Sequence, residues 1–376
     1  MLLVGGGHAN LACLRAAKGW TRAGARVTLL SDSRVLYYSG MVPEFVGGVY
    51  KRDDVEIDLA ELCGKSGVEF IEDAATGIDP ARRAVETAGG RFLSCDLAAF
   101  DIGGVNPGHD LAPGSLPTKP LRLIARLVDW LGEIERNSDQ THALVVVGGG
   151  AAGTELLLNV SARTHELVRE GRLRLTLIEP KARLLPEFAP NLSRRAEKLL
   201  RGRGVEVRLG AQVERGDDGE IVLKGGEHLP ADFVLWATGT GGPPLYRASA
   251  LLCEERGLLR VDRTLRAESA PWLFAAGDGA AVAGLERLER SGVHAVKQGL
   301  TLRENLGRLV RAALEGRDLA AVRLTPFRPY PIAPYLMSTG TPEGMMALGE
   351  RVGLRGLPIL TLKHKLDRRF ARRYRR

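Results

Sequence analysis

The sequence has few cysteines and no long hydrophobic run, and both absences restrict its function. The four cysteines form no CxxC or CxxxxC pair, so we expect buried thiols rather than a dithiol relay. No apolar stretch approaches the roughly 20 residues that cross a bilayer, which limits membrane contact to the surface. The chain enters its first glycine turn at once and leaves no room for a secretory leader, so we expect a cytoplasmic protein, with a peripheral position on the inner membrane face as the alternative.

The composition fits a globular protein with an uneven charge. A chain of 376 residues with 44% hydrophobic content can form two or three domains. Most of its net charge of +8 lies at the end, where eight Lys or Arg residues follow from Lys363 onward against the single acid Asp367. A nucleic-acid surface needs a wider basic face, so we expect no nucleic-acid partner.

The first glycine-rich turn, Gly5 to Asn10, stands between a strand over Leu2–Val4 and a helix over Ala9–Trp20. Its glycines let backbone N–H groups approach a pyrophosphate at a helix N-terminus. Asn10 replaces the third glycine of the pattern, so the pattern gives less support for close helix-to-strand packing here, but Gly5 and Gly7 are retained. The next strand, Arg26–Leu30, brings Ser31 or Asp32 to the place where a ribose is held.

The second turn has the complete GxGxxG pattern, with Gly148, Gly150 and Gly153 between a strand over 143–147 and a helix over 154–167. The following strand ends in Glu179. A carboxylate there accepts the hydroxyls of an adenosine ribose and repels a 2′-phosphate, so NADH is favoured over NADPH. Lys181 and Arg183 weaken that preference.

Three further segments suit a flavin. The loop 37–43 lies at the carboxyl edge of the first sheet, unless it is a simple surface connection. Asp278, at the end of an apolar strand, would accept a hydrogen bond from the ribityl chain, or would serve as a turn or N-cap residue. The helix that begins after Ser291 would direct its positive end at the flavin, although His294 and Lys297 also suit ordinary helix positions.

Together these features predict a flavoprotein that takes electrons from a nicotinamide nucleotide. The predicted fold is α/β, with two Rossmann-like dinucleotide-binding domains and a small C-terminal segment. The FAD domain is discontinuous, over residues 1–118 and 241–325. The NAD(P)H domain is inserted at 119–240, and the C-terminal segment covers 326–376.

The order of these motifs resembles the pyridine nucleotide-disulfide oxidoreductase superfamily over the whole chain. The segments 5–9, 38–43, 101–103, 291–299 and 363–369 resemble the subgroup that is otherwise fused to selenide, water dikinase, whose relatives are type II NADH dehydrogenases and sulfide:quinone reductases. The resemblance implies FAD in the first fold, with Ala75 contacting adenine through its backbone, and NAD(P)H in the second. The flavin then carries the chemistry, and no catalytic side chain or metal is expected.

The residues expected to bind cofactors form two sets. Those for FAD are Gly5, Gly7, His8, Ala9, Asn10, Ser31, Asp32, Ser39, Gly40, Met41, Pro43, Ala75, Gly103, Gly277, Asp278, Val293, His294 and Ala295. Those for NAD(P)H are Gly148, Gly150, Gly153, Glu179 and Gly239.

Two departures from these relatives bear on the electron acceptor. Sulfide:quinone reductases need redox cysteines late in the sequence, and nothing after Cys253 serves, so that activity is not expected. Type II NADH dehydrogenases carry a Gln pair where this chain has Val293 and Lys297, so the quinone stays one candidate acceptor. The alternatives are a soluble reductase of a selenium or sulfur compound or of a protein, a non-catalytic redox sensor, and a nucleic-acid-binding module.

The last segment, 357–376, has an amphipathic pattern. Leu362, Leu366, Phe370 and Tyr374 recur every fourth position among basic residues. The pattern predicts a helix that lies on an anionic membrane, or one that packs on its own domain with its basic stems extended along the surface.

Overall fold

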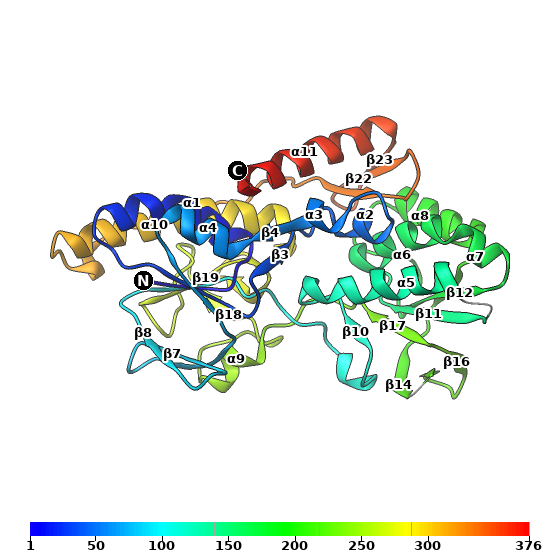
Figure 1. The fold of residues 1–376 in the computed structure, drawn as a ribbon, viewed down its shortest axis with the longest axis horizontal. Coiled ribbons are helices and arrows are strands. Elements are labelled where there is room, and N and C mark those ends of the chain that lie inside the picture. The colour runs from blue at the N-terminus through cyan, green and yellow to red at the C-terminus, as the bar shows by residue number, and fades with distance from the viewer. Residues whose placement is uncertain (138–139, 218, 287, 376) are drawn as a thin grey trace.

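The computed structural model describes residues 1–137, 140–217, 219–286 and 288–375. It consists of two α/β lobes side by side, with the C-terminal helix lying above both (Figure 1). Each lobe contains a five-stranded parallel sheet, so the predicted α/β class with two Rossmann-like units is confirmed. Within the described ranges, no helix is both long enough and apolar enough to span a membrane.

The first sheet has the strand order β19-β9-β1-β2-β5, and its neighbouring strands are parallel. Its strands are β1 (Leu2–Val4), β2 (Thr28–Ser31), β5 (Glu69–Glu72), β9 (Ala98–Phe100) and β19 (Leu273–Ala275). The central strand β1, its neighbour β9 and the edge strand β19 are entirely apolar and buried, as expected for parallel strands that are covered on both faces. The strand order reverses between β1 and β9, which is where such sheets bind ligands.

Helices cover one face of this sheet and smaller strands the other (Figure 1). The helices are α1 (His8–Arg22), α4 (Leu59–Ser66) and α10 (Gly292–Leu314). The opposite side holds β6 (Ala75–Asp79), β7 (Ala84–Thr87), β8 (Phe92–Ser94), α9 (Pro244–Ala248) and the pair β18 (Leu259–Val261) and β20 (Ala280–Val282). Gly299 lets α10 approach α1 closely, since a Cβ there would lie 2.7 Å from Ala9 Cα. This contact brings the start of α10 toward the first glycine turn.

The second sheet has the order β10-β17-β11-β12-β13 and is also parallel. Its strands are β10 (Leu116–Pro117), β11 (His142–Val147), β12 (Leu173–Glu179), β13 (Glu206–Leu209) and β17 (Phe233–Trp236). Around it lie α5 (Ala125–Asn137), α6 (Ala151–Arg163), α7 (His165–Arg169), α8 (Pro190–Gly202) and the antiparallel strands β14 (Val213–Asp217), β15 (Glu220–Leu223) and β16 (His228–Pro230). Its edge strand β10 lies just before residue 118, within the segment that was predicted to belong to the FAD domain.

Two segments tie the lobes together. The first follows β3 (Val35–Tyr37) and includes α2 (Val42–Val46), α3 (Arg52–Val55) and β4 (Glu56–Asp58). Although α2 comes early in the chain, Val42, Phe45 and Val46 are buried in the hydrophobic core of the second lobe. The other segment is the C-terminal unit of β21 (Tyr335–Ser338), β22 (Gly344–Leu348), β23 (Val352–Gly356) and α11 (Leu357–Arg375). Short 3-10 turns η1 (His109–Leu111), η2 (Leu121–Ile124), η3 (Gly277–Gly279) and η4 (Leu319–Ala321) complete the connections.

Candidate functional site

The first glycine turn packs tightly against the end of β9. Gly5 has φ +83°, and a Cβ there would lie 2.4 Å from the Asp101 carbonyl oxygen. A Cβ at Gly7 would lie 2.3 Å from the Asp101 carboxyl carbon. Both positions therefore need glycine for the turn itself to form. Among the described residues the N–H groups of Gly6 and His8 donate no hydrogen bond, so the turn keeps donors for a phosphate group.

Asn10 contributes to the packing of this turn. Its Nδ2 donates to the carbonyl oxygens of Val4 at 3.1 Å, Gly5 at 2.8 Å and Ala99 at 3.1 Å. The amide thus joins β1, the turn and β9 from within α1. In place of the close contact that a glycine allows, the side-chain amide of Asn10 therefore holds the helix on the strand through hydrogen bonds.

Asp101 follows β9 and contacts the first turn, and no role was predicted for its side chain from the sequence. Its Oδ2 accepts hydrogen bonds from the N–H groups of Ala9 at 2.6 Å and Asn10 at 3.2 Å. The side chain is buried, and this burial raises the pKa of Asp101 to about 7 against the opposing effect of the two amide bonds. Its position directly after the strand that faces β1 was the available signal.

The predicted ribose and adenine residues lie on the carboxyl side of β2 and β5. The buried Ser31 accepts a backbone hydrogen bond from Asp73 at 2.9 Å. Asp32 forms an ion pair with Arg122 at 2.8 Å at the surface. Ala75 opens β6. Asp32 is thus committed to a salt bridge that crosses from the first lobe to η2.

The second turn repeats the architecture of the first. Gly148 has φ +111°, and a Cβ there would lie 2.6 Å from the Ala237 carbonyl oxygen. A Cβ at Gly153 would lie 2.0 Å from the Gly148 carbonyl oxygen, which keeps α6 close to the turn. At Gly150 an added Cβ meets no heavy atom of the described residues within 4 Å. Gly148 and Gly153 are therefore needed for folding, whereas Gly150 faces open space.

Glu179 is buried at the end of β12 and is bound to the same turn. Its Oε2 accepts from the N–H of Gly149 at 2.7 Å, and its Oε1 accepts from the N–H of Lys181 at 2.9 Å. Arg183 donates to the carbonyl oxygens of Phe188, at 2.9 Å, and Pro186. Its guanidinium is thus directed at the backbone of its own loop.

Asp278 forms an ion pair with Lys119, whose Nζ lies 2.6 Å from the carboxylate. The same ammonium donates to Thr240 Oγ1 at 2.6 Å. This trio joins η3, the segment between β10 and η2, and the turn after β17, at which Gly239 lies. Gly103 follows β9 with φ +72°. Lys119 was not predicted from the sequence, because a lysine between Pro117 and Pro120 belongs to no recognised motif.

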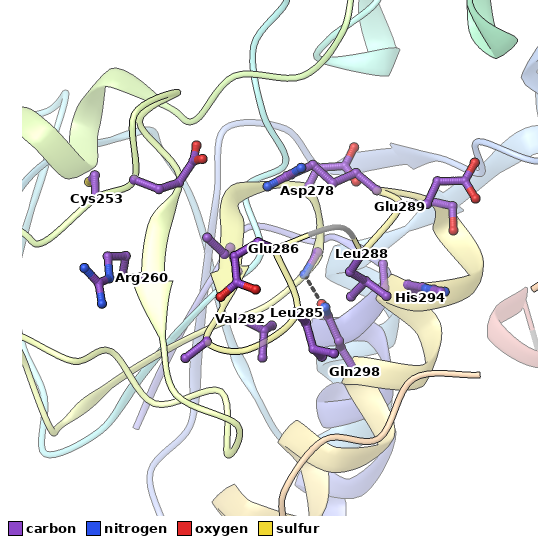
Figure 2. Close-up of a pocket in the computed structure, with 18 of the residues that line it drawn as sticks. Cys253, Arg260, Asp278, Val282, Leu285, Glu286, Leu288, Glu289, His294 and Gln298 are labelled. Atoms are coloured by element: carbon purple, nitrogen blue, oxygen red, sulfur yellow. Dashed lines mark hydrogen bonds between the residues drawn. The ribbon is translucent and has the colours of Figure 1, made fainter. Parts of the chain in front are cut away.

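A cavity of about 380 Å³ opens beside η3 and the start of α10 (Figure 2). Gly277, Asp278, His294 and Ala295 of the predicted set line it. Gln298 Oε1 accepts from the N–H of Gly277 at 2.6 Å, which fixes the turn on the helix. Neither ring nitrogen of the buried His294 has a hydrogen-bond partner among the described residues, and burial lowers the pKa of this imidazole.

The loop 37–43 is not a simple surface connection. Ser39 Oγ lies 3.3 Å from His8 Nε2, and a Cβ on Gly292 would lie 3.4 Å from Ser39 Oγ. The loop, the first turn and the start of α10 therefore meet. Met41 and Pro43, in contrast, are buried at the start of α2, and the neighbouring Val293 is 40% exposed.

The family model for pyridine nucleotide-disulphide oxidoreductases matches residues 1–299. The chain belongs to this family. The predicted enzyme class and the cofactors FAD and NAD(P)H are thereby confirmed. The finer resemblance to the kinase-fused subgroup stays a prediction.

Several proteins of similar sequence have names that state the reaction they catalyse. A type II NADH:quinone oxidoreductase of Staphylococcus saprophyticus is 26% identical over 339 residues, which are 84% of this chain and 83% of the relative. A demethylphylloquinone reductase of Synechocystis is 28% identical over 293 residues, 74% and 71% of the two chains.

Solved structures share the fold. NDH2 from Plasmodium falciparum has a TM-score of 0.81 at 13% identity and covers 98% of this chain and 96% of its own. The sulfide:quinone oxidoreductase from Aquifex aeolicus has a TM-score of 0.76 at 17% identity and covers 100% and 91%. These identities support the architecture alone.

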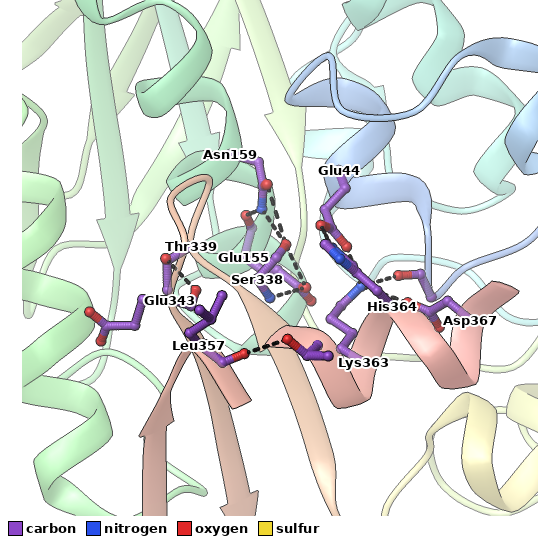
Figure 3. Close-up of polar contacts among 12 residues, drawn as sticks. Glu44, Glu155, Asn159, Ser338, Thr339, Glu343, Leu357, Lys363, His364 and Asp367 are labelled. Atoms are coloured by element: carbon purple, nitrogen blue, oxygen red, sulfur yellow. Dashed lines mark hydrogen bonds and ion pairs between the residues drawn. The ribbon is translucent and has the colours of Figure 1, made fainter. Parts of the chain in front are cut away.

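In this oxidoreductase the C-terminal helix α11 is anchored by buried charges (Figure 3). Lys363 Nζ donates to Glu44 Oε2 at 2.8 Å, to Asp367 Oδ2 at 2.9 Å and to the Gly40 carbonyl oxygen at 2.6 Å. His364 Nε2 lies 2.5 Å from Glu44 Oε1. The cluster therefore binds α11 to α2 and to the predicted flavin loop.

Glu155 of α6 extends this network into the second lobe. Its Oε1 accepts from the Ser338 N–H at 2.8 Å, and Asn159 Nδ2 donates to Ser338 Oγ at 2.9 Å. Burial raises the pKa of Glu155 to about 7, with the Lys363 charge opposing it. Neither Glu155 nor Lys363 was assigned from the sequence, because their partners are distant in the chain.

The apolar stripe predicted on α11 does not form one face. Leu362 and Leu366 are 41% and 45% exposed, whereas Tyr374 is buried and Phe370 stacks on Tyr38 with ring centroids 4.3 Å apart. Four residues advance about 40° beyond a full helical turn, so a four-residue repeat winds around the helix. The first half of the repeat therefore faces outward, and the second half packs on the first lobe.

Proposed function

We propose that this protein oxidises NADH and passes the electrons through FAD to a quinone. The observation that carries the proposal is the pair of glycine turns, one at the strand reversal of each parallel sheet. The first would hold FAD, together with the α10 start, and the second would hold NADH. FAD supplies storage of two electrons between donor and acceptor. The protein positions both rings and, through the α10 N-terminus, stabilises negative charge.

The quinone is favoured by the names of the relatives, not by the residues of a recognised pocket. Lys297 Nζ lies 3.6 Å from the Tyr330 ring centroid, so the position that carries Gln in type II NADH dehydrogenases holds a cation–π contact here. The second candidate is reduction of a selenium or sulfur compound or of a protein, without a quinone. Cys253 lies at the cavity, and burial raises the pKa of its thiol, which does not favour a reactive thiolate there.

The test is anaerobic reduction of the purified protein by NADH, followed by mixing with a quinone, a disulfide or selenite. We expect bleaching of the flavin absorbance by NADH and rapid recovery with the quinone. Recovery with the disulfide or selenite alone would favour the second candidate. Tight FAD binding without reduction by NADH would indicate a non-catalytic sensor.

NADH preference is tested through Glu179. Glu179→Gln keeps an acceptor for the Gly149 N–H and removes the charge that disfavours a 2′-phosphate. We expect the ratio of kcat/KM for NADH over NADPH to fall by about tenfold, the equivalent of one charged hydrogen bond. The exposed Glu166→Gln is the control and should leave the ratio unchanged. An unaltered ratio in Glu179→Gln would remove this residue from cofactor selection.

We further propose that the protein docks on an anionic membrane through the outward half of α11. Leu357, Leu362 and Leu366 are exposed there. A basic groove lies beside them, formed by Arg15, Lys365, Arg368, Arg369, Arg372 and Arg373 with Thr361 and His364. Each basic side chain near such a surface contributes about 1 kcal/mol, which would add to the insertion of the leucines.

Flotation with phosphatidylglycerol vesicles tests this docking. Leu362→Asp with Leu366→Asp should move most of the protein from the vesicle fraction to the free fraction, and high salt should release the unaltered protein. Leu314→Asp changes a leucine that is 47% exposed at the end of α10 and serves as the control. Equal flotation of all variants would exclude α11 as the docking element.

A further inference from the structure

Asp101 occupies the place where the first turn meets α1. Its carboxylate accepts the N–H groups of Ala9 and Asn10, at 2.6 and 3.2 Å. Glycines enclose it on two sides, since a Cβ at Gly7 would lie 2.3 Å from its Cγ and a Cβ at Gly277 would lie 2.4 Å from its Oδ1. With 4% of its surface exposed, Asp101 is a resident anion at the positive end of α1.

The same helix end is the site at which a diphosphate would bind. The N–H groups of Gly6 and His8, which make no hydrogen bond within the described ranges, adjoin the amides that Asp101 occupies. A diphosphate bound by these two N–H groups would lie next to the carboxylate, because His8 directly precedes Ala9, whose N–H group Asp101 accepts. Like charges at such a distance in a buried site disfavour ionisation of the weaker acid, and a carboxylic acid is a far weaker acid than a phosphodiester.

We propose that Asp101 is a cofactor-positioning residue that caps α1 and is a neutral carboxylic acid when the FAD diphosphate lies on the adjoining turn, so that FAD binding takes up one proton. The proposal rests on the assignment of the first turn to FAD. It gives Asp101 two roles: the carboxylate completes the helix cap before FAD binds, and the acid form avoids repulsion afterwards.

The neighbouring titratable groups do not supply this proton near neutral pH. Cys13 of α1 and Tyr246 of α9 have a pKa raised by burial, so both stay protonated. Desolvation lowers the pKa of His8 to about 4, so this imidazole stays neutral. Asp278 faces Asp101 from η3 and is held in the ion pair with Lys119.

The pH dependence of FAD binding follows from the pKa of Asp101 in the protein without FAD. Burial raises the pKa of Asp101 to about 7, so below pH 7 the acid is already protonated and FAD binding needs no further proton. Above pH 7 the proton must be taken up, and the affinity for FAD falls by about tenfold per pH unit until the higher pKa of the complex is reached.

Calorimetric titration of the full-length, FAD-stripped protein with FAD tests the proposal between pH 6 and 9. Repeating each titration in two buffers with different ionisation enthalpies counts the protons. We expect uptake of about one proton per FAD near pH 8.5, falling toward zero at pH 6. Asp101→Asn keeps an oxygen acceptor for both amides and should bind FAD with a constant Kd and without this uptake.

The matched control is Asp262→Asn. Asp262 also accepts backbone amides, from Thr264 at 2.7 Å and Arg266 at 3.2 Å, but on a turn after β18. This variant should take up the same proton as the unaltered protein. A Kd that is independent of pH in the unaltered protein, or an Asp101→Asn variant that still takes up the proton, would overturn the proposal.

Two outcomes separate this inference from the cofactor assignment. If Asp101→Asn does not fold, the proton count of the unaltered protein decides alone. If the unaltered protein retains no FAD at any pH, the assignment of the first turn fails and the proposal with it. FAD binding without proton uptake overturns the role of Asp101 and leaves the assignment intact.

Discussion

Gly150→Val should lower the rate of flavin reduction by NADH by about 100-fold or more while FAD stays bound. In the protein itself an added Cβ at Gly150 meets no described heavy atom within 4 Å, so the fold has no steric reason to change. The side chain would instead fill the space through which a pyrophosphate approaches the second turn. The measurement is stopped-flow bleaching of the flavin absorbance at saturating NADH.

The control for this variant is Gly202→Val. Gly202 ends α8, and a Cβ there also has open space within 4 Å of the described residues. It introduces the same side chain away from the second turn and should leave the reduction rate unchanged. If Gly150→Val is reduced at the normal rate, NADH does not use this turn. If Gly150→Val loses FAD as well, its effect is not confined to the nucleotide site.

Lys363→Met should cost about 3–5 kcal/mol of the free energy of unfolding, because removal of one partner of a buried pair leaves uncompensated charge. The Lys363 side chain is only 4% exposed, and it faces both Glu44 and Asp367. Burial raises the pKa of the nearby Glu155 to about 7 although the Lys363 charge opposes this effect, so without that charge the pKa of Glu155 would rise further and this carboxylate would bind a proton in the folded state before the unfolded state does. The loss of stability should therefore shrink as the pH falls toward 5.

Denaturant unfolding at pH 8 and pH 5 measures this effect. Lys365→Met, on the exposed face of the same helix, is the control and should change the free energy of unfolding by less than about 0.5 kcal/mol. Limited proteolysis adds a local readout, since α11 should become cleavable in Lys363→Met. A variant as stable as the unaltered protein at pH 8 would show that the cluster does not hold α11 in place.

The strand and glycine turn that open each of the two parallel sheets were predicted well from the sequence. Strand β1 was predicted at its observed bounds, β11 was predicted to within one residue, and β12 ends at Glu179 as predicted, because apolar runs beside glycine turns are local signals. The glycine turns were found for the same reason. The predicted helix over 154–167 instead begins at Ala151 and divides at Thr164, whose hydroxyl bonds back to Val160.

The site residues that were not predicted from the sequence depend on contacts between segments that are far apart in the chain. Lys119 meets Asp278, and Lys363 meets Glu44, across separations of 159 and 319 residues. Such pairs have no spacing that a single sequence reveals. The four-residue repeat of α11 was visible, but its winding from solvent to core depends on where the helix is anchored, and a buried lysine and aspartate on that helix determine the anchor.

The burial of α2 in the neighbouring core limits how this enzyme can be divided. Val42, Phe45 and Val46 fill a space in the second lobe, although they precede its own sequence by some 70 residues. A fragment that begins after residue 118 would leave that apolar hollow open to water and should aggregate rather than serve as an autonomous module. The same buried contact opposes a hinge motion between the two lobes.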